Sequence, residues 1–107
     1  MKRGEVWTLR DDRYANKARP VVVVQSDNMH EFDSIVLCLF TTFESKHIPT
    51  RVFISADLTN GLKKDSYIMT EKIVTVAKVE LGEKIGILTD AQVIKVANQL
   101  TVILGIK

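Results

Sequence analysis

Cysteine and histidine are almost absent from this 107-residue sequence, which limits the chemistry it can support. Cys38 is the only cysteine, so an intrachain disulfide and a cysteine-rich metal site are both excluded. His30 and His47 have no acidic or cysteine partners at ligand spacing, so we expect no metal site. The five glycines are scattered and form no phosphate-binding loop. Any catalysis must therefore use Arg, Thr, Ser, Glu, Asp or His, and we expect no cofactor.

Long hydrophobic runs are missing as well. No apolar stretch approaches the roughly 20 residues that cross a membrane, and residues 1–5 lack the apolar block of a signal peptide. Hydrophobic residues make up 46% and charged residues 26%, the usual balance of a soluble globular protein. We therefore expect one domain spanning residues 1–107, located in the cytoplasm and without contact with a membrane.

Charge of one sign is not dominant overall, since the formal net charge is only +2. It is uneven, however: the chain through Arg19 carries six Lys or Arg (positions 2, 3, 10, 13, 17 and 19) against three acids (5, 11 and 12). This basic excess beside Trp7 and Tyr14 suits an RNA surface, where cations meet phosphates and aromatic rings stack on bases. It suits a solvated face equally well.

The pattern of apolar residues predicts mainly β-structure. Residues 5–10 alternate polar and apolar, which is typical of a half-buried strand. Short β-branched runs predict central strands over 21–25 and 35–40. Further strands are predicted over 50–55, over 65–76 as one strand or two, and over 85–88.

The end of the chain changes to helical spacing. Thr89 and Gln92 have capping-box form, and Gly105 is a natural stop. The apolar residues between them recur at i, i+3, i+4 and i+7, which predicts an amphipathic helix: Val93, Val96, Ala97, Leu100 and Ile103. Strands followed by one terminal helix favour an α+β fold, with a small, strongly bent sheet or barrel closed by that helix.

Several polar residues lie at the predicted strand ends. Pro20 restricts the backbone at Arg19, so a forked cation stands at a stiff strand end, which suits capture of a phosphate or carboxylate. A hydroxyl at Thr41 and an acid at Glu71 complete a set suited to metal-free RNA cleavage. Each has a simpler interpretation: a surface ion pair, a threonine that favours β-structure, and a strand glutamate that faces water.

Five segments, in order, resemble the MazF/PemK family of toxins from type II toxin–antitoxin pairs. They cover nearly the whole chain and begin with Arg3-Gly4-Glu5-Val6-Trp7 and the Arg19-Pro20 strand ending Gln25-Ser26-Asp27. The others are Leu39-Phe40-Thr41-Thr42, Asp65-Ser66-Tyr67-Ile68 with residues 71–76, and Ile85-Gly86 with Leu104-Gly105.

The resemblance implies an SH3-like β-barrel of the MazF/PemK/CcdB toxin type and a homodimer. It further implies a metal-independent, sequence-specific endoribonuclease that cleaves single-stranded RNA, leaves a 2′,3′-cyclic phosphate and a 5′-hydroxyl, and is covered by a cognate antitoxin. It assigns catalysis to Arg19, Thr41 and Glu71, with Thr42 and Ser66 around them.

The chain also departs from the family pattern. The loop before Arg19 lacks the family's glycine element, so the cleavage sequence is not inherited, and Tyr14 or Lys17 is expected to contribute to RNA contact. Where some members have an arginine, this chain has Met69, which places more weight on Arg19. Two rival functions remain open: a toxin of the same fold that inhibits DNA gyrase, and a plain SH3-like binding module.

Overall fold

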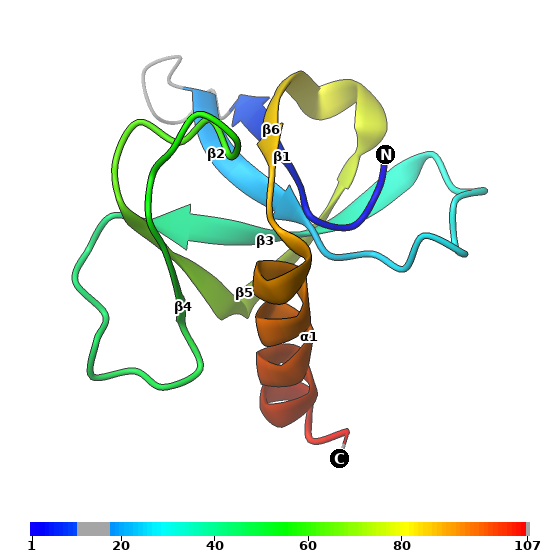
Figure 1. Cartoon of the computed structure of the whole chain (residues 1–107). Helices are drawn as coiled ribbons and strands as arrows, with labels where there is room; N and C mark the ends of the chain where they lie inside the picture. The colour runs from blue at the N-terminus through cyan, green and yellow to red at the C-terminus, as the bar shows by residue number, and fades with distance from the viewer. Residues whose placement is uncertain (11–17, 107) are drawn as a thin grey trace.

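The computed structural model describes residues 1–10 and 18–106 of the chain. Within them the element order is β1 (Glu5–Arg10), β2 (Ala18–Val23), β3 (Ser34–Thr41), β4 (Val52–Ile54) and β5 (Ser66–Ala77), then the 3-10 helix η2 (Lys78–Glu80), β6 (Leu81–Ile87) and α1 (Asp90–Leu104). The predicted fold class, mainly β with a C-terminal helix, is confirmed (Figure 1).

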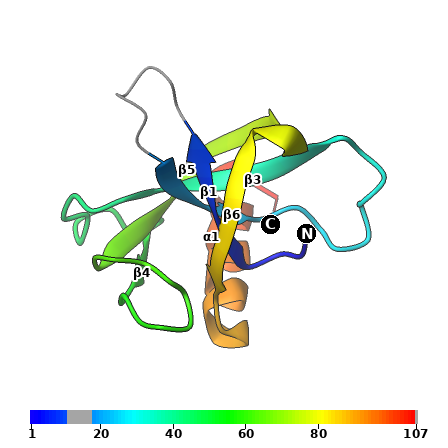
Figure 2. The ribbon, with the colours of Figure 1, turned by 90° about the horizontal axis from the view of Figure 1, so that it is seen from above.

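The strands form one antiparallel sheet in the order β4-β5-β3-β2-β1-β6. Figures 1 and 2 show that this sheet is strongly twisted, with α1 beside β5. No pairing joins the edge strands β4 and β6 among the residues described, so the sheet is an open form of the expected barrel. The largest differences from the expected boundaries are that β2 begins three residues earlier than 21 and that β6 begins at Leu81, four residues before 85.

The sheet is buried on both faces at its centre, because two apolar clusters lie on its opposite sides. Successive valines of β2 point to opposite faces of the sheet. Val22 belongs to the cluster that includes Val96 of α1, whereas Val21 and Val23 belong to the other cluster. All three are at most 1% exposed. This explains the unbroken apolar run in the sequence, since a strand covered on both faces has no polar side to present.

β5 is one strand with an irregularity at its middle. Cys38 of β3 pairs with Ile73, but the next residue, Leu39, pairs with Met69, so residues 70–72 of β5 have no opposite partner on β3. Such an insertion bends the strand and re-aims its side chains. Glu71 lies within this bulge.

The terminal helix begins and ends where the sequence predicts. The Thr89 side chain accepts a hydrogen bond from the Gln92 N–H at 3.2 Å, and the Gln92 side chain accepts one from the Thr89 N–H at 2.9 Å. Gly105 ends the helix in the left-handed conformation, with φ of 67°. Val96 is buried in the core and Leu100 packs against it, but Ile103 is 37% exposed, so the apolar face packs on the core as far as Leu100 and not at its last turn.

Candidate active site

Arg19 and Thr41 lie at the same end of two neighbouring strands. The pairing of β2 with β3 includes Val21 opposite Leu39, and extending this register by two residues places Arg19 across from Thr41. The pairs begin at Val21 because Pro20 has no N–H to donate. Since side chains alternate along a strand, Arg19 and Thr41 share the face of Val21 and Leu39. The structure thus places the two main predicted residues at the same end of adjacent strands.

Thr41 is the last residue of β3, and its side chain is half-buried. Its Oγ1 accepts a hydrogen bond from the Phe43 N–H at 3.1 Å, which fixes the rotamer as the chain turns out of the sheet. An oxygen that accepts from a backbone N–H keeps its own hydrogen for donation. The hydroxyl is therefore held in place while remaining able to donate to a ligand.

Glu71 is bound by an arginine that the sequence analysis did not single out. Arg51 Nε donates to Glu71 Oε2 at 3.0 Å, the NH2 group donates to the same oxygen, and NH1 donates to Ser45 Oγ at 3.0 Å. The hydrogen bond from Arg51 holds the pKa of the Glu71 carboxyl below its ordinary value. Glu71 is thus an ionised partner of Arg51, and its side chain remains 32% exposed.

Tyr67 pairs with Thr41 across β5 and β3 and has its own acidic partner. Its phenolic hydroxyl donates to Glu44 Oε1 at 2.7 Å. This hydrogen bond lowers the pKa of Glu44 and raises the pKa of Tyr67, so the pair consists of a carboxylate and a neutral phenol at neutral pH. The loop that carries Glu44 is therefore fastened to β5 at Tyr67 as well as at Glu71.

The predicted surrounding residues Thr42 and Ser66 line one cavity of about 610 Å³ at this end of the sheet. Pro20, Lys63, Lys64 and Glu83 line it too, so two cations and one acid stand beside the residue that follows Arg19. Ser66 is 2% exposed and donates its hydroxyl hydrogen to the Lys64 carbonyl at 2.8 Å. Its observed contact therefore holds the neighbouring loop in place.

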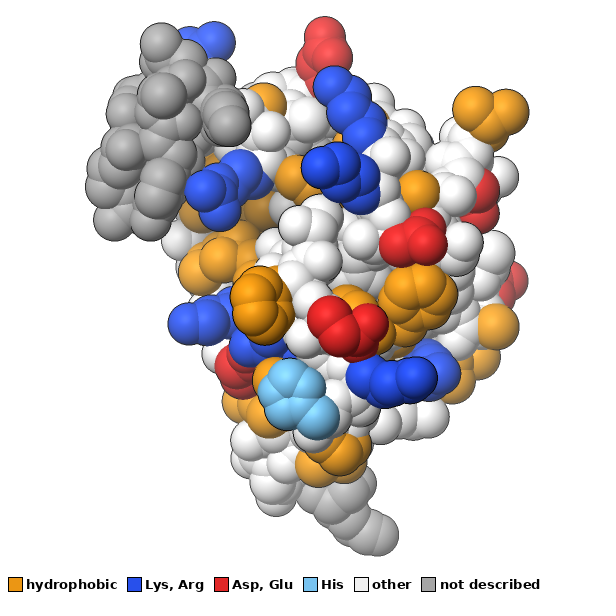
Figure 3. All heavy atoms as spheres, turned by 90° about the vertical axis from the view of Figure 1, so that its left-hand side faces the viewer, with side chains coloured by type: hydrophobic (Ala, Val, Ile, Leu, Met, Phe, Trp, Pro, Cys, Tyr) orange, Lys and Arg blue, Asp and Glu red, His pale blue; other side chains and the backbone are white. Residues whose placement is uncertain are grey.

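The surface at this end mixes basic and apolar side chains. Figure 3 shows Lys and Arg side chains spread around exposed hydrophobic ones, with a few acids between them. Phe43 is 74% exposed and Phe53 is 49% exposed. Two predicted contact residues, Tyr14 and Lys17, lie outside the described residues. Among those described, no group of three or more His, Cys, Asp or Glu is arranged to hold a metal ion.

The pairing of Arg51 with Glu71 was missed because it depends on which strands are neighbours in the sheet. Arg51 and Glu71 are 20 residues apart and sit on predicted strands, but nothing in the sequence specified that these strands would pair. The pairing of β4 with β5, Val52 to Ile68 through Ile54 to Ser66, is what places residue 51 beside the bulge. The bulge itself has no sequence signature, because neither glycine nor proline marks it.

The fold and this site define a small, twisted sheet with an arginine and a hydroxyl residue at one end of two adjacent strands. A family model described as "PemK-like, MazF-like toxin of type II toxin-antitoxin system" matches residues 2–104. The chain belongs to this family.

Two individual relatives are similar to this chain in sequence over most of their length. "Probable endoribonuclease MazF" of Mycolicibacterium smegmatis is 30% identical over 107 residues, covering 99% of this chain and 98% of that protein. "Endoribonuclease MazF" of Staphylococcus epidermidis is 36% identical over 90 residues, covering 82% and 74%.

Solved structures of toxins from this family are similar to this chain in fold. An endoribonuclease in complex with its cognate antitoxin, from a mycobacterial species, superposes with a TM-score of 0.82 at 27% identity and covers 100% of this chain and 97% of that one. The MazE–MazF structure from Deinococcus radiodurans has a TM-score of 0.79 at 16% identity, covers 98% and 95%, and supports the fold alone.

Proposed function

We propose that this chain is the toxin of a toxin–antitoxin pair and cleaves single-stranded RNA at specific sequences, thereby inhibiting translation and growth. The observation that carries the proposal is the placement of Arg19 and Thr41 at one end of adjacent strands. Membership of a family with relatives named as endoribonucleases supports the same activity. The gyrase-inhibiting alternative has no use for this pair of side chains.

The proposed reaction needs neither a metal nor a nucleophile from the protein. The RNA 2′-hydroxyl gives its proton to a solvent water, its oxygen bonds to the adjacent phosphorus, and the bond from phosphorus to the 5′-oxygen breaks. The products are a 2′,3′-cyclic phosphate and a 5′-hydroxyl, the latter formed when the leaving oxygen gains a proton. Charge accumulates on the phosphoryl oxygens during this step, so the largest requirement is a fixed cation beside them.

Arg19 meets that requirement because its guanidinium stays protonated and matches a phosphate with two parallel donors. Thr41 is assigned to donate its remaining hydrogen to a phosphoryl or leaving oxygen, from a rotamer fixed by the Phe43 N–H. Glu71 is assigned to positioning, since its carboxylate is occupied by Arg51 and holds the loop that follows Thr41. From the sequence we expected Glu71 to act as the base or to support Arg19, whereas the carboxylate pairs with Arg51 instead.

Two partners complete the proposal. A cognate antitoxin would cover the basic end of the sheet, as an acidic peptide would be attracted to the cations around the cavity. A second copy of the chain is supported by apolar side chains left exposed along α1 and just beyond it: Ile94, Val102, Leu104 and Ile106 are all more than half exposed. The location of the protein is a separate part of the proposal. None of the helices among the residues described is long and apolar enough to cross a membrane. We place the protein in the cytoplasm, where its RNA substrate is found.

The test is incubation of purified protein with long single-stranded RNA in excess EDTA, followed by sequencing of the new 5′ ends and mass analysis of the 3′ ends. Cleavage at a recurrent word with cyclic phosphate ends is expected. Intact RNA, together with gyrase trapped on DNA in a parallel assay, would replace this proposal with the inhibitor alternative. Intact RNA without gyrase trapping would favour a binding module.

A further inference from the structure

Four side chains form a row across one face of the sheet at its basic end. Phe53 of β4 pairs with Tyr67 of β5, and Tyr67 pairs with Thr41 of β3. The β2–β3 pairing ends at Val21 and Leu39, and the same register extended by two residues would continue the row to Arg19. Directly paired residues point to the same face, so an aromatic pair, a hydroxyl and a cation follow one another in that order.

Phe53 is exposed and Tyr67 is half-buried, whereas their neighbours along each strand are buried. Phe53 is 49% exposed, whereas Val52 and Ile54 on either side of it are 2% and 0% exposed. The ring centroids of Phe53 and Tyr67 are 5.4 Å apart at 61°, an edge-to-face contact. Cross-strand aromatic pairs do stabilise edge strands, and that alone would explain the contact. It does not explain the position of the pair beside Thr41 or the way in which Tyr67 is held.

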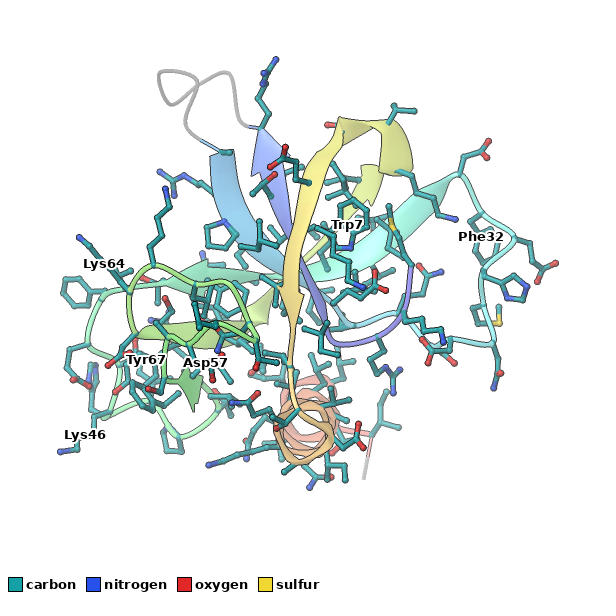
Figure 4. All side chains as sticks on the ribbon, turned by 45° about the horizontal axis from the view of Figure 1, so that its top comes forward. Trp7, Phe32, Lys46, Asp57, Lys64 and Tyr67 are labelled. Atoms are coloured by element: carbon teal, nitrogen blue, oxygen red, sulfur yellow. The ribbon has the colours of Figure 1, made fainter. Side chains whose placement is uncertain are left out.

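Tyr67 is half-buried and is held by its hydroxyl. Glu44 accepts the phenolic hydrogen, and the turn after Thr41 carries Glu44 close to β5. An aromatic ring fixed at its polar tip offers a rigid surface, so little conformational freedom is lost when another ring stacks on it. Figure 4 shows Tyr67 on the same side of the molecule as Lys46 and Lys64, with Phe32 on the opposite side.

Charge gives the row a direction. The carboxylate of Glu44 stands at the aromatic end, where it repels a phosphate, and the guanidinium of Arg19 stands at the other end, where it attracts one. Neighbouring strands are about 4.8 Å apart, so Tyr67 lies one spacing and Phe53 two spacings from the strand of Thr41. A base lies within this range of the phosphate of its own nucleotide or of the next one.

We propose that Phe53 and Tyr67 form a stacking platform for one base of the RNA, beside the phosphate held at Arg19 and Thr41. The platform rests on the proposed function and adds a binding subsite to it. Stacking is tolerant of base identity, so the platform supplies affinity and register along the RNA. It leaves the choice of sequence to contacts elsewhere.

The experiment uses the full chain and an oligonucleotide containing its mapped cleavage word, with a 2′-deoxy sugar at the cut so that binding is measured without cleavage. Phe53→Leu keeps an apolar side chain on β4 but removes the ring face. Phe32→Leu is the matched control, because Phe32 is 50% exposed and lies on the opposite side of the molecule (Figure 4). Fluorescence anisotropy is expected to show a roughly 5- to 100-fold rise in Kd for Phe53→Leu and no change for Phe32→Leu.

Replacing each base in turn by an abasic nucleotide identifies the stacked position. At one position the abasic RNA should weaken binding to the wild type by a similar factor and cause no further loss in Phe53→Leu. Phe53→Trp, which keeps a ring, should bind as the wild type does. Equal losses for both proteins at every position, or an unchanged Kd for Phe53→Leu, would overturn the platform.

The proposed function is tested separately in the same set of measurements. Failure of the wild type to cut the unmodified RNA would refute the nuclease, whatever the variants do. Cutting by the wild type with a normal Kd in Phe53→Leu would refute only the platform.

Discussion

Arg51 and Glu71, 20 residues apart, form a charge-assisted pair that fastens the loop after β3 to the bulge of β5. The same guanidinium donates to Ser45 Oγ at 3.0 Å, and Ser45 is fully buried. Ser45 in turn donates to the Phe43 carbonyl at 2.9 Å. The contacts therefore run from the bulge to the residue whose N–H fixes the Thr41 hydroxyl, and the shape of the candidate site depends on them.

Glu71→Gln is expected to destabilise the fold in a pH-dependent manner. The folded-state pKa of Glu71 is lowered, so its contribution is present above the unfolded-state pKa and is lost as pH falls through the folded value. Because both side chains are partly exposed, we expect a loss of about 1 kcal/mol at pH 7. Urea melts at pH 7 and pH 3 measure this loss, which should shrink at the lower pH.

Glu31→Gln, an exposed substitution outside this loop, is the control and should leave the melts unchanged. A Glu71→Gln loss of the same size at both pH values would contradict an ionised pair with Arg51.

Gly61 and Gly105 both have positive φ, but only Gly61 is also tightly packed. A Cβ at Gly61 would lie 2.0 Å from the Ile85 carbonyl oxygen, whereas one at Gly105 would meet nothing within 4 Å. We expect Gly61→Ala to cost about 3 kcal/mol or more, from strain and overlap together, and Gly105→Ala about 1 kcal/mol from strain alone. Thermal or urea denaturation of the two variants compares these costs directly, and similar costs would show that the overlap is relieved.

Cys38 is expected to be unreactive in the folded protein. Burial raises the pKa of its thiol to about 12, and the side chain is fully buried in the core. Only the thiolate reacts with a disulfide reagent. Native protein at pH 8 should therefore release no thionitrobenzoate from DTNB over minutes and one equivalent after unfolding in guanidinium. Rapid reaction of the native protein would contradict the burial of β3 on this face.

The sequence predicted those elements whose signals are local. The capping box at Thr89, the glycine stop at Gly105 and the double-sided burial of residues 21–23 all depend on nearest neighbours or on a simple period, and the structure has each of them. The strand starts at Ala18 and Leu81 were missed, because charged residues, proline or glycine follow them and break the apolar pattern; pairing with β1 makes these segments strands.

The candidate site was predictable only in part, for the same reason. Arg19 and Thr41 could be proposed because each follows or precedes an apolar run, and adjacent antiparallel strands then bring them to one end. The partners of Glu71 and Tyr67 could not be predicted. They are Arg51 and Glu44 of the loop between β3 and β4, and tertiary contacts decide the path of that loop.

Thr41→Val tests whether the hydroxyl acts on the RNA. Valine keeps the β-branched shape of the half-buried side chain but removes the donor, so we expect RNA cleavage to fall by about 100-fold or more while RNA binding changes little. Thr41→Ser, which retains the hydroxyl, should recover most of the rate. Single-turnover cleavage assays measure both variants, and an unchanged rate in Thr41→Val would remove Thr41 from the mechanism.

The central claim is that the Arg19 guanidinium stabilises the charge that develops on the scissile phosphate. The most direct measurement is single-turnover cleavage of one mapped RNA by wild type, Arg19→Lys and Arg19→Ala, alongside their thermal melts. Arg19 is exposed at the start of β2, so the melts should coincide. The account predicts a loss of about 100- to 1000-fold or more in Arg19→Ala and a smaller loss in Arg19→Lys. If Arg19→Ala folds normally and cleaves the RNA at the wild-type rate, the proposed role of Arg19 is contradicted.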